Sequence, residues 1–383
     1  MFADRSQNQF GDEETKQLPS VSEFNLETNY AISHDRNEAK NKQLRTGDEK
    51  EDKQNQDSTT YWKSFFQSIL KKVNIFNIVV HRKTVPVMIL IQAGSLFLFG
   101  ESSGKYGFNF SLDLVFTCFF GLFACFYCEV LNDITDIEVD RINHPKRPLV
   151  SGKATIQDAY FVLMVTFIVS IFLGFAIAKT PLSYFILLSH FTLSTLYSFP
   201  KIRLARHWIL GPISLAAASL CGRMFILVCT KLYTETTDGQ LLIALILFVT
   251  FIHHLLIIPL KDVNETDGDN IDNGSSFVMK VPLGFMKFIA IIGYTLPWII
   301  FYSGITRLTE SQNINPELLE ALKFLAIIFV LIGFVQSFLI IKMDWLLKYQ
   351  HFKWFSELGM NFIFMISLSG VGVLVQAWHK KQE

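Results

Sequence analysis

The sequence has few cysteines and no excess of charge of either sign. Its five cysteines all lie in apolar stretches, so no disulfide framework is indicated. Cys125 and Cys128 form a CxxC pair without a second ligand pair, and we interpret both as small packing residues. Lysine plus arginine and aspartate plus glutamate both total 34. Net charge therefore gives no support for an acidic partner, and we expect no nucleic-acid partner.

The first 60 residues lack any sustained apolar run. They are rich in Asp, Glu, Lys, Asn and Gln, and a segment of this composition cannot bury enough surface to fold. The absence of an early apolar core excludes a secretory signal peptide, and Asp12, Glu13 and Glu14 are atypical of a transit peptide. We expect residues 1–60 to form a disordered cytosolic tail. Residues 61–80 set aromatic side chains among lysines, and we expect them to lie on a membrane surface.

Long hydrophobic stretches dominate the rest of the chain, residues 81–383. Hydrophobic residues make up 50% of the sequence, and runs such as Tyr160–Ala178 are long enough to cross a bilayer. Within lipid each span must satisfy its own backbone hydrogen bonds, so the fold class is an all-α integral membrane protein. About nine spans are predicted, near residues 85–100, 111–131, 158–178, 181–199, 208–230, 240–260, 283–303, 320–341 and 357–378.

Basic residues are distributed unevenly between the predicted loops. The loops after the even-numbered spans, and the stretch before the first span, carry most of the lysines and arginines near the membrane. Positively charged residues mark the cytoplasmic face. We therefore expect the N-terminus and the even-numbered loops to be cytoplasmic.

An acidic motif follows the second span and reads Asn132-Asp133-Ile-Thr-Asp136-Ile-Glu-Val-Asp140. The three aspartates are spaced i, i+3 and i+7, which places them on one face of a helix. Three neighbouring carboxylates repel each other and are costly beside a bilayer. A divalent cation would remove that cost, and carboxylate oxygens suit Mg²⁺.

A second acidic motif follows the sixth span and repeats the same spacing with Asp262, Glu265 and Asp269. Both motifs fall on the predicted cytoplasmic face. Two similar halves that meet around one site would explain the repetition. The plainer interpretation is a pair of solvated acidic loops, but that would not explain why the spacing recurs in register. We expect Asp133, Asp136, Asp140, Asp262, Glu265 and Asp269 to bind Mg²⁺, with Asp133, Asp136 and Asp262 essential for catalysis.

Cationic and polar residues accompany both motifs. Positive charge beside Mg²⁺ suits a diphosphate leaving group, on which negative charge grows as its carbon–oxygen bond breaks. Arg223 lies inside the fifth span, where a charge is by default a functional candidate. The candidate substrate-binding residues are Asn132, Arg141, Arg147, Tyr197, Lys201, Arg203, Arg223 and Lys261.

Magnesium, a diphosphate and an apolar helical chamber together indicate the ionisation of an allylic diphosphate. The carbocation that forms must be shielded from water, and aromatic side chains stabilise it. The chain contains 37 phenylalanines, which are suited to lining such a chamber.

These motifs resemble the signatures of the UbiA superfamily of intramembrane prenyltransferases. The first motif continues as Arg141-Ile-Asn143-x-Pro145-x-Arg147-Pro148, the second reads Lys261-Asp262-x-x-Glu265-x-Asp267-Gly268-Asp269, and Tyr197-x-x-x-Lys201 resembles the middle motif of the family. The resemblance covers roughly residues 80–378 and is greatest for the homogentisate, chlorophyll and ether-lipid branches. It implies a nine-helix bundle with a central chamber, metal binding by the acidic residues, and diphosphate binding by Arg147, Tyr197 and Lys201.

Three functions remain open. The first is transfer of a prenyl group from a prenyl diphosphate to a hydrophobic acceptor, most simply an aromatic quinone precursor, in the lipid bilayer. The second is a terpene cyclase of the same superfamily, which ionises the diphosphate but uses no acceptor. The third is an ion-coupled carrier, against which stands the interfacial position of both motifs, since carriers bind substrate at the midplane.

Overall fold

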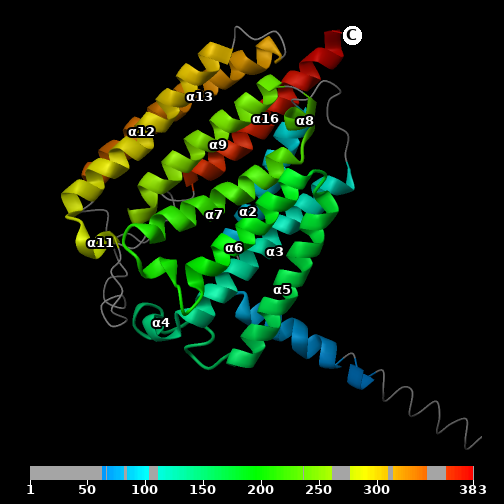
Figure 1. Cartoon of the computed structure of the whole chain (residues 1–383), viewed down its shortest axis with the longest axis vertical. Coiled ribbons are helices and arrows are strands. Elements are labelled where there is room, and N and C mark those ends of the chain that lie inside the picture. The colour runs from blue at the N-terminus through cyan, green and yellow to red at the C-terminus, as the bar shows by residue number, and fades with distance from the viewer. Residues whose placement is uncertain are drawn as a thin grey trace, which may run out of the picture. The chain divides into compact units, whose positions relative to one another are not determined.

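The computed structural model describes residues 63–65, 67–81, 84–102, 111–235, 237–260, 277–308, 314–342 and 359–382 (Figure 1). The chain divides into two units, Met1–Lys72 and Val73–Glu383. The predicted tail, residues 1–60, lies outside the described residues. So does the second acidic motif, with Lys261, Asp262, Glu265 and Asp269.

All described regular structure in the second unit is helical. The long helices are α2 (Thr84–Ser102), α3 (Leu112–Thr135), α5 (Ile156–Ile177), α6 (Pro181–Ser198), α7 (Leu210–Val228), α9 (Thr237–Ile257), α12 (Leu283–Leu308), α13 (Pro316–Ile341) and α16 (Gly359–Gln382). The short elements are α4 (Ile137–Asn143), η1 (Leu204–Arg206), α8 (Lys231–Glu235) and α11 (Phe277–Lys280). Figure 1 shows α4 and α11 at one end of the long helices and α8 at the other.

The long helices confirm the prediction of about nine spans. Eight are long and apolar enough to cross a membrane, and α6 is the ninth long helix among the described residues. Helix α6 is less apolar because it carries serines, threonines and a histidine. Large apolar side chains such as Phe172 on α5 and Phe324 on α13 are exposed, as expected for surfaces that face lipid. The protein is therefore a multi-pass membrane protein.

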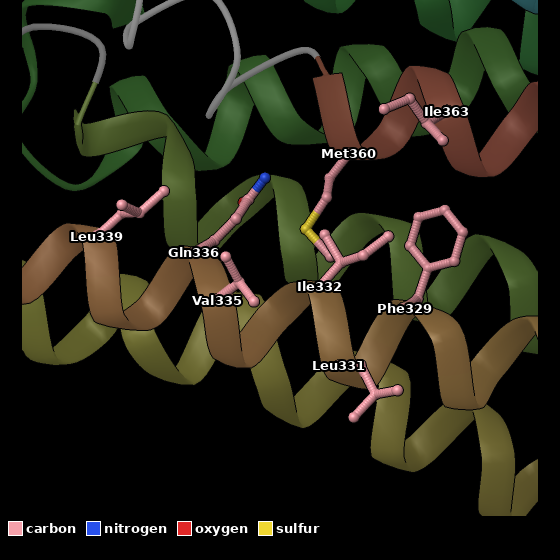
Figure 2. Close-up of a pocket in the computed structure, with 8 residues that line it drawn as sticks. All are labelled: Phe329, Leu331, Ile332, Val335, Gln336, Leu339, Met360 and Ile363. Carbon is pink, nitrogen blue, oxygen red and sulfur yellow. The ribbon is translucent and has the colours of Figure 1, made fainter.

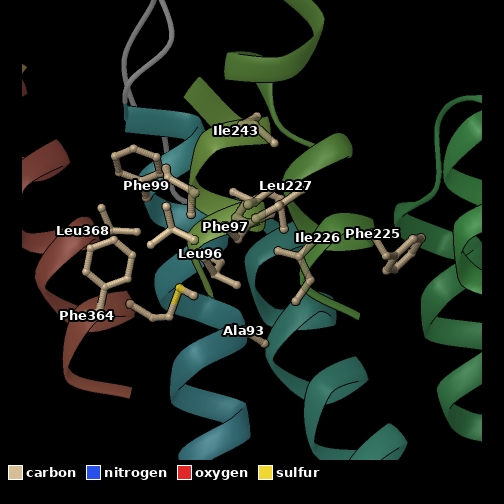
Figure 3. Close-up of a cluster of buried hydrophobic side chains, with 14 of the residues drawn as sticks. Ala93, Leu96, Phe97, Phe99, Phe225, Ile226, Leu227, Ile243, Phe364 and Leu368 are labelled. Carbon is tan, nitrogen blue, oxygen red and sulfur yellow. The ribbon is translucent and has the colours of Figure 1, made fainter. Parts of the chain in front are cut away.

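Packing closes the helices into a ring. Along the chain, α3 packs on α2, α6 on α3, α7 on α6, α9 on α7, α12 on α9, α13 on α12 and α16 on α13. The last helix, α16, then packs against α2, and α5 lies against α3. Leu96 and Phe99 of α2, Phe364 and Leu368 of α16 and Leu227 of α7 belong to the core cluster shown in Figure 3.

The segment before α2 is packed more closely than its amphipathic pattern predicts. Val79 and Val80 are buried in a small cluster with Val130 of α3 and Val162 of α5. The ring of Phe76 lies 5.7 Å from that of Phe126 on α3. The apolar side of residues 75–80 therefore covers protein.

A cavity of about 360 Å³ lies between α13 and α16. Figure 2 shows Phe329, Ile332 and Gln336 of α13 and Met360 and Ile363 of α16 around it. Among the described residues that line it, Gln336 is the polar one.

Candidate active site

The first acidic motif lies at a break between two helices, which corrects the expectation of one continuous helical stripe. Helix α3 ends at Thr135, Asp136 has non-helical torsion angles (φ −102°, ψ 12°), and α4 begins at Ile137. The backbone N–H of Asp136 still bonds to the carbonyl oxygen of Asn132 at 2.9 Å, and the N–H of Asp140 bonds to the carbonyl oxygen of Asp136 at 2.8 Å, so hydrogen bonds continue on both sides of the bend.

Arg147 joins the two ends of the motif. Its Nη1 lies 3.1 Å from Oδ1 of Asp133 and also donates to Oδ2 of Asp140. Asp133 is 6% exposed and Asp140 3% exposed. One guanidinium nitrogen therefore bridges two buried carboxylates, one on each side of the break.

Arg203 holds the third aspartate. Its Nη2 donates to Oδ1 of Asp136, across the gap between the α3–α4 break and the segment after α6. Arg203 has φ 40°, the only positive φ of a non-glycine residue in the described part of the chain. A left-handed backbone is costly for an arginine, so the ion pair lies at a strained turn.

Two residues that the sequence analysis did not single out as candidates also contact the motif. His81, from the segment before α2, has Nδ1 at 3.5 Å from Oδ2 of Asp133. Ser198, at the end of α6, donates from Oγ to Oδ1 of Asn132 at 3.5 Å. His81 lies 52 positions before Asp133 and belongs to no motif, so the sequence gives no signal for it. Ser198 directly follows Tyr197 of the middle motif, and this adjacency is the signal that could have identified it.

The remaining candidates are distributed differently. Arg141 is exposed and pairs with Glu138, 3.4 Å away, on the outer side of α4. Lys201 is exposed, and Tyr197 lies in the last turn of α6. Arg223 is buried in α7, among the residues of the bundle interior. The structure thus brings together Asp133, Asp136, Asp140, Arg147 and Arg203, and leaves Arg141 and Lys201 on the surface.

The residues of this site fit a divalent cation by chemistry. Burial raises the pKa of the Asp140 carboxyl to about 6, although the nearby Arg147 guanidinium opposes that rise. Three carboxylates face two arginines, so negative charge remains in excess, and hard oxygen donors suit Mg²⁺. Within the described ranges no three acidic, histidine or cysteine side chains converge closely enough to enclose an ion. In this structure the guanidinium of Arg147 lies between the carboxylates of Asp133 and Asp140.

Comparison with known proteins identifies the family of the chain. Residues 95–309, more than half of the chain, match the model of the UbiA prenyltransferase family. The chain belongs to the UbiA prenyltransferase family.

Individual relatives match shorter stretches. A 2-acylphloroglucinol 4-prenyltransferase of Humulus lupulus is 32% identical over 128 residues, which cover 32% of this chain and 29% of the relative. A digeranylgeranylglyceryl phosphate synthase of Methanococcus aeolicus is 30% identical over 199 residues, covering 47% of this chain and 62% of the relative. The chain thus spans less than two thirds of the length of these relatives.

The UbiA fold extends over most of the described chain. A UbiA homologue from Archaeoglobus fulgidus, whose structure was solved with GPP and Mg²⁺, superposes with a TM-score of 0.58. The two are 14% identical, and the match covers 79% of this chain and 99% of that one. At this identity the likeness concerns the fold.

Proposed function

We propose that this UbiA-family protein transfers a prenyl group from a prenyl diphosphate to a hydrophobic acceptor, and that the transfer depends on Mg²⁺. The observation that carries the proposal is the site at the α3–α4 break, where Asp133, Asp136 and Asp140 face Arg147 and Arg203. The carboxylates provide negative charge that suits a metal ion, and the arginines provide positive charge that suits a diphosphate, at the end of an apolar helical bundle.

Each group of residues has a distinct part in this proposal. Asp133, Asp136 and Asp140, with Asp262, Glu265 and Asp269, would hold the metal, and Asn132 and Ser198 would orient the first set. When bound, the metal neutralises the diphosphate and supports its departure. Arg147 and Arg203 would bind the diphosphate oxygens, for which bidentate guanidinium groups are well suited.

The bundle around the site would exclude water from the reacting carbon. Phe120, Tyr127 and Phe191 are buried where α3 meets α6, and the ring centroid of Phe191 lies 6.5 Å from that of Phe120 and 5.6 Å from that of Tyr127. Aromatic faces at this position would stabilise positive charge on the prenyl group while it is transferred. Names of the relatives support an aromatic or a glyceryl acceptor.

We also propose the orientation in the membrane. Basic residues favour a cytoplasmic position for the ends of α3, α6, α9 and α13, and hence for both acidic motifs. Figure 1 shows α4 and α11, which follow α3 and precede α12, at the same end of the bundle. Residues 1–60 would then be a cytosolic tail.

The test uses membranes that contain the protein, Mg²⁺ and labelled farnesyl or geranylgeranyl diphosphate, with and without phenolic acceptors. A labelled product that forms only with an acceptor supports the proposal. A hydrocarbon formed without an acceptor would instead indicate a terpene cyclase. Asp133→Asn should abolish either product, and Glu138→Gln, which changes an exposed carboxylate on the same segment, should not.

A further inference from the structure

Three helices place buried polar side chains in the interior of the bundle, apart from the acidic motif. They are Arg223 on α7, His253 on α9 and Trp298 on α12, and they are 7%, 0% and 0% exposed. In the part of the chain that the structure describes, Nε and Nη1 of Arg223, Nε2 of His253 and Nε1 of Trp298 have no hydrogen-bond partner. The proposed function assigns His253 and Trp298 no part.

The hydrogen bonds of His253 define which of its atoms can bind a ligand. Its Nδ1 lies 2.8 Å from the carbonyl oxygen of Gly293 on α12. A carbonyl oxygen only accepts, so Nδ1 carries the hydrogen and Nε2 presents a lone pair. Arg223 lies on α7, which packs directly against α9. His253 is 0% exposed, and an unpaired positive charge in a dry helical interior would be unfavourable. The ring therefore remains neutral.

The indole of Trp298 packs beside this imidazole. Their ring centroids are 5.3 Å apart, with the planes inclined at 53°. The ring centroids of Phe329 and Phe364 each lie 4.8 Å from that of Trp298, and the ring centroid of Tyr294 lies 5.6 Å from that of His253. The polar atoms are thus surrounded by aromatic rings, which suits a ligand with a polar group on an apolar body.

The unmatched atoms comprise donors and one acceptor. A buried polar group without a partner costs about 1–3 kcal/mol, so a protein that retains several of them gains from a ligand that satisfies them. The guanidinium and the indole N–H can donate to an oxygen, whereas Nε2 of His253 must receive a hydrogen. A hydroxyl group offers both. A diphosphate or a carboxylate offers no hydrogen and would face the lone pair of Nε2.

We propose that Arg223, His253 and Trp298 bind the hydroxyl group of the acceptor. This inference rests on the proposed prenyl transfer, and it assigns the recognition of the acceptor to residues apart from the acidic motif. Nε2 of His253 accepts the hydroxyl hydrogen, and Arg223 and Trp298 donate to the oxygen.

The first experiment measures binding without turnover. Purified protein is melted in detergent with phloracetophenone or a monoalkyl glyceryl phosphate, and with the corresponding methyl ethers, which lack the O–H. Wild-type protein should be stabilised by at least one hydroxylated probe and less by its ether. His253→Asn retains a donor for the Gly293 carbonyl and loses the Nε2 acceptor, so it should lose that difference. His253→Gln, whose carbonyl reaches the Nε2 position, should recover part of it.

A matched control is available on the neighbouring helix pair. His190 of α6 also bonds through Nδ1 to a backbone carbonyl, that of Ala218, at 2.8 Å. His190→Asn should therefore preserve the preference for the hydroxylated probe. If no hydroxylated probe stabilises wild-type protein more than its ether, or if His253→Asn retains the preference, the proposal is wrong.

The second experiment measures kinetics once an acceptor supports turnover. His253→Asn should raise the KM for the acceptor about tenfold, the value of one hydrogen bond, and leave the KM for the prenyl diphosphate unchanged. An equal rise in both values would place the cluster at the diphosphate and overturn the proposal. Hydroxyl-specific stabilisation without any prenyl product would reject the proposed function and leave this site intact.

Discussion

Replacing Arg147 by alanine tests the site at the α3–α4 break most directly. Its Nη1 contacts both Asp133 and Asp140, whose side chains are 7% and 5% exposed. The substitution removes the cation and leaves two buried carboxylates facing each other. Breaking a buried ion pair by removing one partner costs about 3–5 kcal/mol. Since the Arg147 side chain is itself 15% exposed, water reaches the site and we expect the lower end, about 3 kcal/mol.

The assay is thermal unfolding of the purified protein in detergent, first in EDTA and then in Mg²⁺. Arg147→Ala should melt well below wild-type protein in EDTA. Mg²⁺ at about 100 times its dissociation constant stabilises a protein by about 2.7 kcal/mol, which would restore most of the loss. Wild-type protein should gain less, because Arg147 competes with the ion for the same oxygens. Arg147→Lys, which retains the charge, should fall between the two.

Two results would refute this reasoning. If Arg147→Ala were as stable as wild-type protein in EDTA, the bridge would contribute nothing to stability. If Mg²⁺ stabilised both proteins equally, the arginine and the ion would not compete, and the three aspartates would not be the metal site.

Three further predictions concern residues near the site or between helices. In EDTA the raised pKa of Asp140 means that the folded protein binds a proton on this carboxyl more tightly than the unfolded chain does. Protonated Asp140 should therefore stabilise the fold by about 3 kcal/mol below about pH 4, and this stabilisation should be lost as pH rises through about 6. Asp140→Asn should flatten that pH profile of stability. Gly333→Ala should destabilise the bundle by a few kcal/mol in urea or SDS titrations, because its Cβ would overlap a backbone carbonyl oxygen of α12, whereas Gly370→Ala on α16 meets nothing within 4 Å and should be neutral. Arg203→Gly and Arg203→Ala both lose the ion pair with the acidic motif. The free energy of unfolding of the glycine variant should be about 1 kcal/mol higher than that of the alanine variant, since only glycine adopts φ 40° without strain.

The spans could be predicted from the sequence because a bilayer imposes both length and composition on them. Apolar runs near 181–199 and 283–303 became α6 (Pro181–Ser198) and α12 (Leu283–Leu308) with small changes at their ends. The surroundings of residues 75–80 were harder to predict, since contact with lipid and contact with another helix both favour an apolar face. The packing of Phe76 on Phe126 and the burial of Val79 and Val80 show that this face covers protein.

The site was predictable in its residue types and less so in its contacts. Spacing alone placed the aspartates on one helix, but the backbone bends at Asp136. The middle motif favoured Lys201 as a diphosphate-binding residue. In the structure the left-handed turn at Arg203 directs the Arg203 side chain to Asp136, and Lys201 is exposed. A change in backbone direction of this kind depends on tertiary contacts, which a linear spacing rule does not contain.

Helix α6 lies within the bundle, although it is the one long helix of the described residues that is not apolar enough to count as a membrane span. Its Thr195 donates to the carbonyl oxygen of Phe191 at 2.6 Å, so the Tyr127 hydroxyl of α3, 2.7 Å away, must be the donor to Thr195. Tyr127→Phe removes only that bond and keeps the ring packing, and we expect a loss of about 1 kcal/mol. Thr195→Val leaves the buried tyrosine hydroxyl without an acceptor and should cost more, about 2 kcal/mol, while the double variant should recover part of this loss. SDS titrations of the four proteins measure the cycle. If Thr195→Val were no costlier than Tyr127→Phe, the hydroxyl pair would not be what secures α6 against α3.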